Sequence, residues 1–372
     1  MEEEGETGRY TIEEMCIRVK TLLVTTGLAR ELAPLVVIMG HGSFSTNNPY
    51  RSAYDCGACG GRPGRLNSRV FSLMANRKDV RDFVRESGLT IPDQTHFMGA
   101  YHNTCTDEVE YFDLDTLPDS HRKVFEKLKA DIEVARAQNA LERCRRFDEV
   151  LLKKPEYAIA HVESRSHHIA QPRPEYGHAT NAICIVGRRD LTKGLFLDRR
   201  AFLVSYDPSL DENLLSLRNL LRAVVPVCMG INLEYLFSAI DNQKYGAGSK
   251  LPHNVTSLLG IMTGYCSDLR TGLPAQMIEI HEPTRLLCVI EQSIENIYKF
   301  FEAEPELHSI IANRWVALMV YNSNEKSLYY YNESNKFEKI EELTLDLQTV
   351  KNSSEWVIGK TDHLDFVRIK AQ

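Results

Sequence analysis

The spacing of hydrophobic positions predicts helices and strands that alternate along most of the chain, which is typical of an α/β fold. Thr11, with Glu14 three residues later, predicts the start of a helix that stops at Gly27. The apolar run Leu35 to Met39 then predicts a fully buried strand. This strand ends in Gly40-His41-Gly42, which takes a histidine to the edge where open α/β sheets bind ligands.

The same reasoning predicts further elements. Strands are expected over residues 95–101, 108–113, 181–186 and 200–206, and a C-terminal hairpin over residues 315–320 and 327–331. Asn67-Ser68 is expected to cap one helix, and further helices are expected over residues 79–86, 119–146 and 214–225. We expect residues 119–146 to form an exposed amphipathic helix. The helix over residues 214–225 is expected to end at Pro226.

The composition excludes several classes of protein. A net charge of −7 without any basic block argues against nucleic-acid binding. No apolar run approaches the ~20 residues of a membrane-spanning helix, so no transmembrane segment is expected. The acidic N-terminus is unlike a signal peptide. Nine scattered cysteines in 372 residues indicate a reducing, cytoplasmic setting.

His41 and Cys56 are the candidate metal ligands. Cys56 follows His41 by fifteen residues and lies among Gly57, Gly60 and Gly61, which allow the backbone to bend around a small centre. An imidazole and a thiolate are half of a zinc ligand set, but two ligands do not close a tetrahedral site. The alternative interpretation is a structural histidine and an inert buried thiol.

Other constellations have simpler interpretations. Cys56-Gly-Ala-Cys59 is followed by glycines and a proline rather than by a helix, which argues against a disulfide exchanger. Beta-class carbonic anhydrases contain a Cys-x-Asp-x-Arg motif followed later in the chain by His-x-x-Cys. This chain has both motifs in the opposite order, as His102-x-x-Cys105 and Cys266-x-Asp268-x-Arg270, and we interpret both as coincidental. The remaining candidates are interpreted as hydrogen-bonded loop histidines: His167, His168, His253 and His281.

A Cys/His hydrolase is the competing chemistry. In caspase-like folds one strand ends in His-Gly and a later strand ends in the nucleophilic cysteine, which Gly40-His41-Gly42 and Asp55-Cys56-Gly57 imitate. Fifteen residues are too few to cross a helix and return on a second parallel strand, so we rank this alternative second.

Several long motifs resemble those of the DabA family, the soluble zinc subunit of the Dab inorganic-carbon accumulation system. The most specific are His41-Gly-Ser-Phe-Ser-Thr-Asn-Asn-Pro49 and Asp55-Cys-Gly-Ala-Cys-Gly-Gly61. The resemblance runs from about residue 10 to about residue 320 and includes these further segments: 91–95, 102–104, 173–175, 200–202, 230–235, 250–254, 268–274 and 280–283.

The resemblance implies a beta-carbonic-anhydrase-like fold, in which helices flank a mostly parallel sheet, and Zn²⁺ as cofactor. It implies that His41 and Cys56 are one pair of zinc ligands, whereas Cys59 matches a motif position that is not a ligand. It also implies hydration of CO2 to bicarbonate, coupled to cation flow. The protein would be peripheral, on the cytoplasmic side of the cell inner membrane, with an ion-translocating DabB partner.

This chain departs from the family pattern because it lacks the first ligand pair, a Cys-x-Asp that members carry in their N-terminal half. We expect it to be the C-terminal half of a DabA-like zinc domain, over residues 10–320, after an acidic tail (1–9) and before a β-rich extension (321–372). A second chain would then supply Cys and Asp. An inactive fragment and a subunit that only binds its partners remain alternatives.

Overall fold

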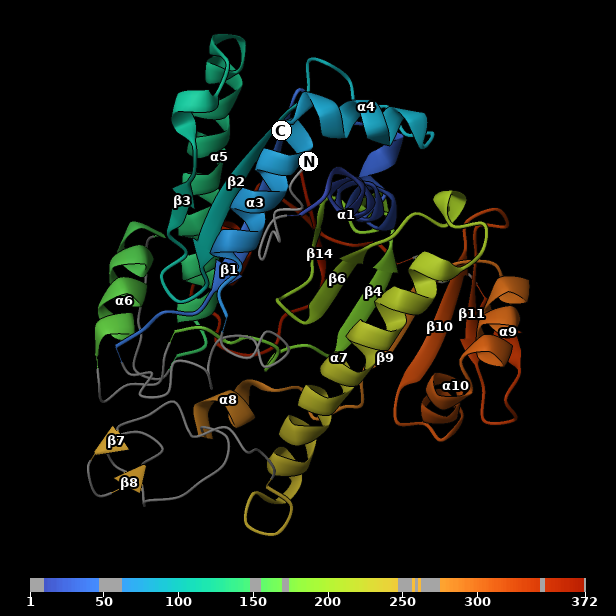
Figure 1. The fold of residues 1–372 in the computed structure, drawn as a ribbon. Helices are drawn as coiled ribbons and strands as arrows, with labels where there is room; N and C mark the ends of the chain where they lie inside the picture. Colours follow the sequence, from blue (N-terminus) through green and yellow to red (C-terminus); the bar gives the residue numbers. More distant parts are fainter. Residues whose placement is uncertain are drawn as a thin grey trace.

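The computed structural model describes residues 10–46, 62–147, 155–168, 174–246, 256–257, 260–261, 275–341 and 345–370. Helices pack on several β-sheets (Figure 1), so the expected mixed α/β class is confirmed. One mostly parallel sheet was expected. The described residues instead form separate sheets of three, six, three and two strands.

The first layer is a βαβ unit. Its elements are α1 (Ile12–Thr25), β1 (Leu35–Gly42), α3 (Arg65–Asn76), α4 (Lys78–Glu86), β2 (His96–Asn103) and β3 (Val109–Tyr111). The strand order is β1-β2-β3, with β2 parallel to β1 and antiparallel to β3. The helices α3 and α4 form the crossover that a parallel pair requires.

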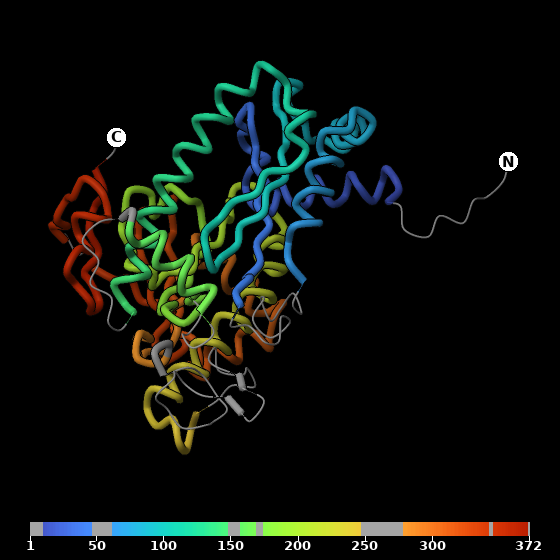
Figure 2. Tube along the Cα trace, turned by 90° about the vertical axis from the view of Figure 1, so that its left-hand side faces the viewer, coloured from blue at the N-terminus to red at the C-terminus, as the bar shows by residue number. Residues whose placement is uncertain are grey.

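Helices cover both faces of this three-stranded sheet. On one face, Phe71 of α3 meets Phe97 of β2 edge to face, with ring centroids 6.2 Å apart. On the other face, Phe125 of the long helix α5 (Asp119–Cys144) packs with Met98. Figure 2 shows α5 running alongside the strands of this sheet.

Of two predicted helix caps, one is confirmed and the other is wrong. The capping box of α1 is confirmed, because the Glu14 N–H donates to Thr11 Oγ1 and the Thr11 N–H donates to the Glu14 carboxylate. The cap of α3 was predicted wrongly: this helix begins at Arg65 after Gly64, two residues before the expected Asn67-Ser68. Ser68 instead donates its hydroxyl to the carbonyl oxygen of Ala100, because α3 lies directly against β2.

The strand β1 is not fully buried, contrary to the prediction. Only Val36 and Gly42 are buried in it, and Met39 is 40% exposed. The physical reason is that β1 lies at the edge of its sheet, which periodicity alone does not show.

The second sheet has six strands in the order β12-β11-β10-β9-β4-β6. Their bounds are β4 (Ile183–Gly187), β6 (Ala201–Ser205), β9 (Leu287–Glu291), β10 (Ala317–Asn322), β11 (Ser327–Tyr331) and β12 (Phe337–Lys339). Four strands are parallel, and β10 and β11 form the predicted C-terminal hairpin. Three helices share one hydrophobic core with this sheet: α7 (Leu215–Asp241), α9 (Ile294–Ala303) and α10 (Pro305–Ala312).

The helix α7 continues through Pro226, where the sequence predicted a stop. Proline removes one backbone hydrogen bond and is unfavourable within a helix. The apolar residues beyond it compensate, because Cys228, Tyr235 and Leu236 are all buried. By length and composition α7 could cross a membrane, but this is weak evidence, since eight of its residues are buried within the fold.

In a further hydrophobic cluster, the C-terminal part of α5 packs against elements from the end of the chain. It contains α6 (Pro155–His167), β5 (Leu195–Phe196), β13 (Thr349–Val350), α11 (Ser353–Val357) and β14 (Val367–Ile369). The remaining described elements are short: β7 (Thr256–Ser257), β8 (Gly260–Ile261), α8 (Ala275–Ile280) and 3-10 turns at Leu28–Arg30, Leu114–Thr116, Arg189–Leu191 and Pro208–Leu210. The expected exposure of α5 holds for much of its length and fails at its end, where Leu141, Arg143 and Cys144 are buried.

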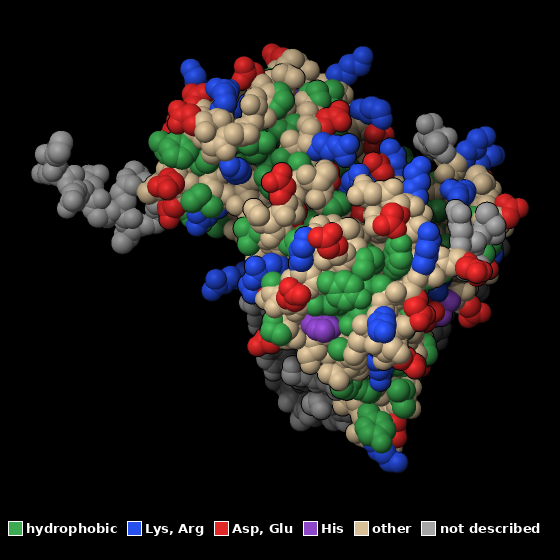
Figure 3. Space-filling view, turned by 90° about the vertical axis from the view of Figure 1, so that its right-hand side faces the viewer, with side chains coloured by type: hydrophobic (Ala, Val, Ile, Leu, Met, Phe, Trp, Pro, Cys, Tyr) green, Lys and Arg blue, Asp and Glu red, His purple; other side chains and the backbone are tan. Residues whose placement is uncertain are grey.

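On the face that carries α9 and α10, acidic and basic side chains are interspersed among hydrophobic ones (Figure 3). This mixture agrees with the modest net charge of the chain.

Candidate functional site

The strand β1 places His41 at its carboxyl end, one residue before the strand stops. In the parallel register His41 lies opposite His102, the penultimate residue of β2. Paired residues of neighbouring parallel strands point to the same face of a sheet, about 5 Å apart. The two histidines therefore lie on the same face at one end of the sheet, and His41 is exposed to solvent.

Two glycines fix the backbone around His41. The amide of Gly64, just before α3, donates a hydrogen bond of 2.7 Å to the His41 carbonyl oxygen. A Cβ on Gly40 would lie 2.2 Å from the Gly64 carbonyl oxygen, so only glycine allows this close approach. The start of α3 is thereby held against the end of β1.

A buried polar network supports His102. Its Nε2 lies 2.9 Å from Asp107 Oδ1, and the guanidinium of Arg143 reaches Asp107 Oδ2 across 2.5 Å. The amide of Asn139 also donates to this carboxylate, at 2.7 Å. Burial works to raise the pKa of Asp107, but the His102 hydrogen bond and the Arg143 charge outweigh it, so the pKa lies below its ordinary value. Asp107 is therefore a stable anion that orients the His102 ring.

The loop after β1 is anchored by a second set of contacts. The Ser43 hydroxyl lies 2.9 Å from Glu175 Oε2 and 3.2 Å from the Cys105 sulfur. Beyond it, Thr46 Oγ1 lies 3.3 Å from Nδ1 of His167 at the end of α6. Loop, strand end and helix thus meet at the carboxyl edge of the sheet.

A cavity of about 540 Å³ opens beside this edge. It is lined by Phe44, Pro63, Arg65, Tyr101, Asn103, Glu108, Val109 and Glu110. Tyr101 and Asn103 alternate with His102 along β2, so the cavity lies on the opposite face of the sheet from the histidine pair. It borders the candidate site without containing it.

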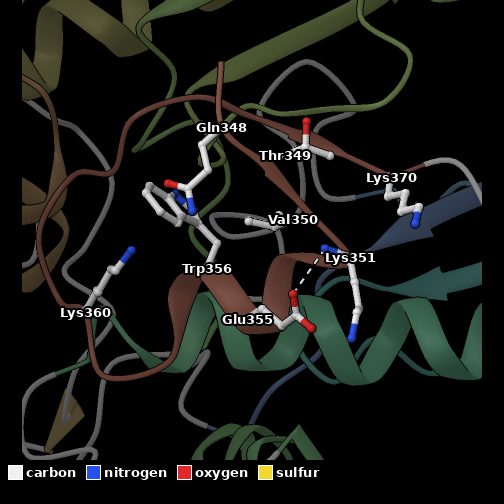
Figure 4. Close-up of a pocket in the computed structure, with 8 residues that line it drawn as sticks. All are labelled: Gln348, Thr349, Val350, Lys351, Glu355, Trp356, Lys360 and Lys370. Atoms are coloured by element: carbon white, nitrogen blue, oxygen red, sulfur yellow. Dashed lines mark hydrogen bonds between the residues drawn. The ribbon is translucent and has the colours of Figure 1, made fainter. Parts of the chain in front are cut away.

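Another cavity, of about 470 Å³, is formed by the end of the chain (Figure 4). Three lysines, Lys351, Lys360 and Lys370, surround it together with Trp356 and Glu355. The Lys360 ammonium already lies 3.1 Å from the centre of the Trp356 ring, where a cation–π contact holds it. This cavity shares no lining residue with the one beside the sheet.

Of the two predicted zinc ligands, the structure places His41, whereas Cys56 lies outside the described residues, as does Cys59. Within the described ranges no group of three His, Cys, Asp or Glu side chains is arranged to hold a metal ion. Cys266, Asp268, Arg270 and His253 also lie outside those ranges. His167 and His281 are hydrogen-bonded, to Thr46 and to the Ala179 carbonyl oxygen, as their simpler interpretation expected.

Sequence reasoning missed the residues behind the histidine pair. His102 was set aside as part of a coincidental motif, and Arg143 was placed on an exposed helix face. The available signal was that two successive predicted strands, over residues 35–39 and 95–101, are each followed within two residues by a histidine, His41 and His102. A parallel pairing of those strands would have placed both side chains together.

The family model described as "Probable inorganic carbon transporter subunit DabA" matches residues 1–316, which is most of the chain. The chain belongs to the DabA family.

Curated DabA proteins cover nearly all of this chain. A Rhodopirellula baltica protein named "Probable inorganic carbon transporter subunit DabA 2" is 46% identical over 363 residues, which is 97% of this chain and 34% of that protein. A Sorangium cellulosum protein with the same name is 48% identical over 363 residues, covering 97% and 36%. The chain therefore spans about a third of the length of these DabA relatives. No solved structure matches it.

Proposed function

We propose that this chain is one part of an energy-coupled complex that accumulates inorganic carbon, in which His41 and Cys56 are two ligands of a CO2-hydrating zinc site. Membership of the DabA family supports the role in inorganic carbon transport. The observation that supports a site at this place is the exposed His41 at the carboxyl end of β1, beside the His102–Asp107 pair.

The donor chemistry of the chain fits zinc. Zinc prefers nitrogen and sulfur ligands in tetrahedral sets, and a catalytic zinc keeps one position for water or substrate. When bound, such a zinc ion lowers the pKa of a coordinated water to about 7, near neutral pH. The chain's own part is to hold the His41 backbone through Gly64 and to keep a fixed anion, Asp107, behind the neighbouring imidazole.

Two ligands leave the zinc set incomplete. We therefore infer that a second DabA-type polypeptide supplies a cysteine and an aspartate across an interface.

The complex would include a membrane partner. The relatives are named as transporter subunits, which implies further subunits for them. We propose a DabB-like ion-translocating partner, CO2 and bicarbonate as substrate and product, and a peripheral position on the cytoplasmic side of the inner membrane.

The test is the zinc content of the purified chain, alone and mixed with the part of the Sorangium cellulosum relative that this chain does not match. We expect weak zinc binding by the lone chain and retention through dialysis by the mixture. His41→Ala should abolish that retention, whereas His167→Ala, a matched change at a hydrogen-bonded histidine, should preserve it. Equally tight zinc binding by the lone chain would contradict the shared site.

Two alternatives predict different results. A binding-only subunit or inactive fragment would join the complex without retaining zinc. A Cys/His hydrolase would react with thiol-directed covalent inhibitors at Cys56 and would need no metal.

A further inference from the structure

The strand β1 has an open edge. Among the described residues it pairs only with β2, and the order β1-β2-β3 places it at the margin of the sheet. The carbonyl oxygens of Pro34 and Gly42 accept hydrogen bonds from the β2 side. Since backbone groups alternate along a strand, the amides of Val37 and Met39 point to the open edge. The His41 carbonyl oxygen points to the same edge and already accepts a hydrogen bond from the Gly64 amide, so the open part of the edge ends at Met39.

This edge lacks the features that protect exposed strands. Exposed edges are usually short or carry charged residues or proline, which prevent pairing with another chain. The opposite edge of the same sheet, β3, follows this rule, because it has three residues and includes Glu110. In contrast, β1 has eight residues, none of them Lys, Arg, Asp, Glu or Pro.

Apolar side chains are exposed along the same strand and just beyond it. Met39 is 40% exposed and Phe44 is 58% exposed. Met39 lies on the same face as Leu35 and Val37, beyond the cluster that they form with α5, so a strand added at the edge would pack beside its side chain. An uncharged edge with exposed apolar side chains is suited to pairing rather than to contact with water.

We propose that a strand of a second DabA-type polypeptide pairs in parallel with the open edge of β1 and so extends the sheet. This inference rests on the proposed function, since it names the surface by which the partner reaches the site. About two thirds of each relative lies outside the part that this chain matches, and this part provides the polypeptide. A parallel strand paired with residues 35–39 would end just before His41, close to the end of the sheet where ligands of an open sheet gather.

A second copy of this chain fits less well. Two copies related by a two-fold axis would pair their β1 strands antiparallel, because the axis reverses the direction of one strand. The two His41 residues would then lie at opposite ends of the pair, and neither would receive further ligands.

The experiment measures backbone amide hydrogen exchange in the full chain, alone and with the unmatched part of the Sorangium cellulosum relative, in buffer containing EDTA. We expect the Val37 and Met39 amides to exchange quickly in the lone chain and at least about tenfold more slowly in the mixture. The Val36 and Ile38 amides face β2 and should be slow in both samples. EDTA removes zinc, so docking is tested independently of the zinc site.

Two variants test the edge directly. Val37→Pro removes one edge-facing N–H while leaving the β2-facing amides in place, and Met39→Lys places a charge on the edge. Both should weaken binding at least about tenfold. The control Leu345→Lys, an equal change at a residue that is 71% exposed, should bind normally. Slow exchange of Val36 and Ile38 in each variant shows that β1 is still folded.

Three outcomes would overturn the inference: slow exchange of Val37 and Met39 in the lone monomer, a complex without added protection of these amides, or protection that appears through self-association alone. Light scattering identifies the last case. If the mixture protects the edge in EDTA but retains no zinc when zinc is supplied, the docking surface stands and the proposed function fails.

Discussion

The guanidinium of Arg143 and the carboxylate of Asp107 form an ion pair with an N–O distance of 2.5 Å and almost no exposure to solvent. Arg143 also donates to three backbone carbonyl oxygens, those of Thr104, Cys105 and Pro174. This one side chain thus ties α5 to the loop after β2 and to the segment that carries Glu175. The candidate site is therefore supported by α5, a helix that the sequence predicted to be exposed.

Removal of Arg143 should strongly destabilise the fold. Arg143→Met leaves the Asp107 carboxylate buried without its cation, and breaking one side of a buried pair typically costs about 3–5 kcal/mol. Arg122→Met is the matched control, because Arg122 pairs with Asp119 on the exposed part of the same helix, where such pairs contribute about 0–1 kcal/mol. Urea unfolding measures both changes, and equal losses would contradict a special role for Arg143.

The contact between Gly40 and Gly64 predicts a position-specific glycine effect. Gly40→Ala should destabilise the chain by about 1–3 kcal/mol, because the new methyl group would push α3 away from β1. Gly230→Ala in α7 should instead stabilise it by roughly 0.5–1 kcal/mol, since no atom lies within 4 Å of that Cβ and alanine favours helix. Thermal and urea unfolding distinguish the two signs. A stabilising Gly40→Ala would refute the close approach.

His281 predicts a loss of stability in mild acid. It is buried against Tyr235, with ring centroids 5.5 Å apart, and burial lowers its pKa. Below pH about 6.5 the unfolded chain takes up a proton that the folded chain resists, so stability falls as the pH drops toward the folded pKa. His281→Phe removes this titration and should flatten the slope between about pH 7 and 5.5.

Tyr235→Phe is the control for this experiment, because it keeps both the ring contact and the imidazole. Its stability should fall with pH as steeply as that of the unmodified chain. If His281→Phe leaves the pH slope unchanged, other histidines account for the acid sensitivity.

The local features of this fold follow from local sequence, whereas the contacts between elements do not. The Thr11 cap and the position of His41 at a strand end were predictable, because both depend on residues that are close together in the sequence. Thr11 and Glu14 form the cap, and the apolar run before His41 ends at Gly40. The pairing of His41 with His102 depends on register across a two-helix crossover, which no local pattern encodes.

The errors have the same origin. Pro226 reads as a helix stop, yet burial of the residues after it outweighs the lost hydrogen bond. Arg143 reads as an exposed residue on a charged helix, because only tertiary structure places Asp107 beside it. The edge position of β1 likewise depends on which strands lie beside it, and not on its own apolar run from Leu35 to Met39.

The two cysteines of the glycine-rich motif should differ in zinc binding. If Cys56 is a ligand and Cys59 is not, Cys56→Ser should lower the zinc affinity of the mixture with the second polypeptide by at least about 100-fold, whereas Cys59→Ser should change it little. Competition with a chromophoric chelator measures both affinities. Both variants keep the size of the side chain and the surrounding glycines, so they are matched in their effect on the backbone. Equal losses would mean that both thiols bind the metal, and loss in Cys59→Ser alone would move the ligand from residue 56 to residue 59.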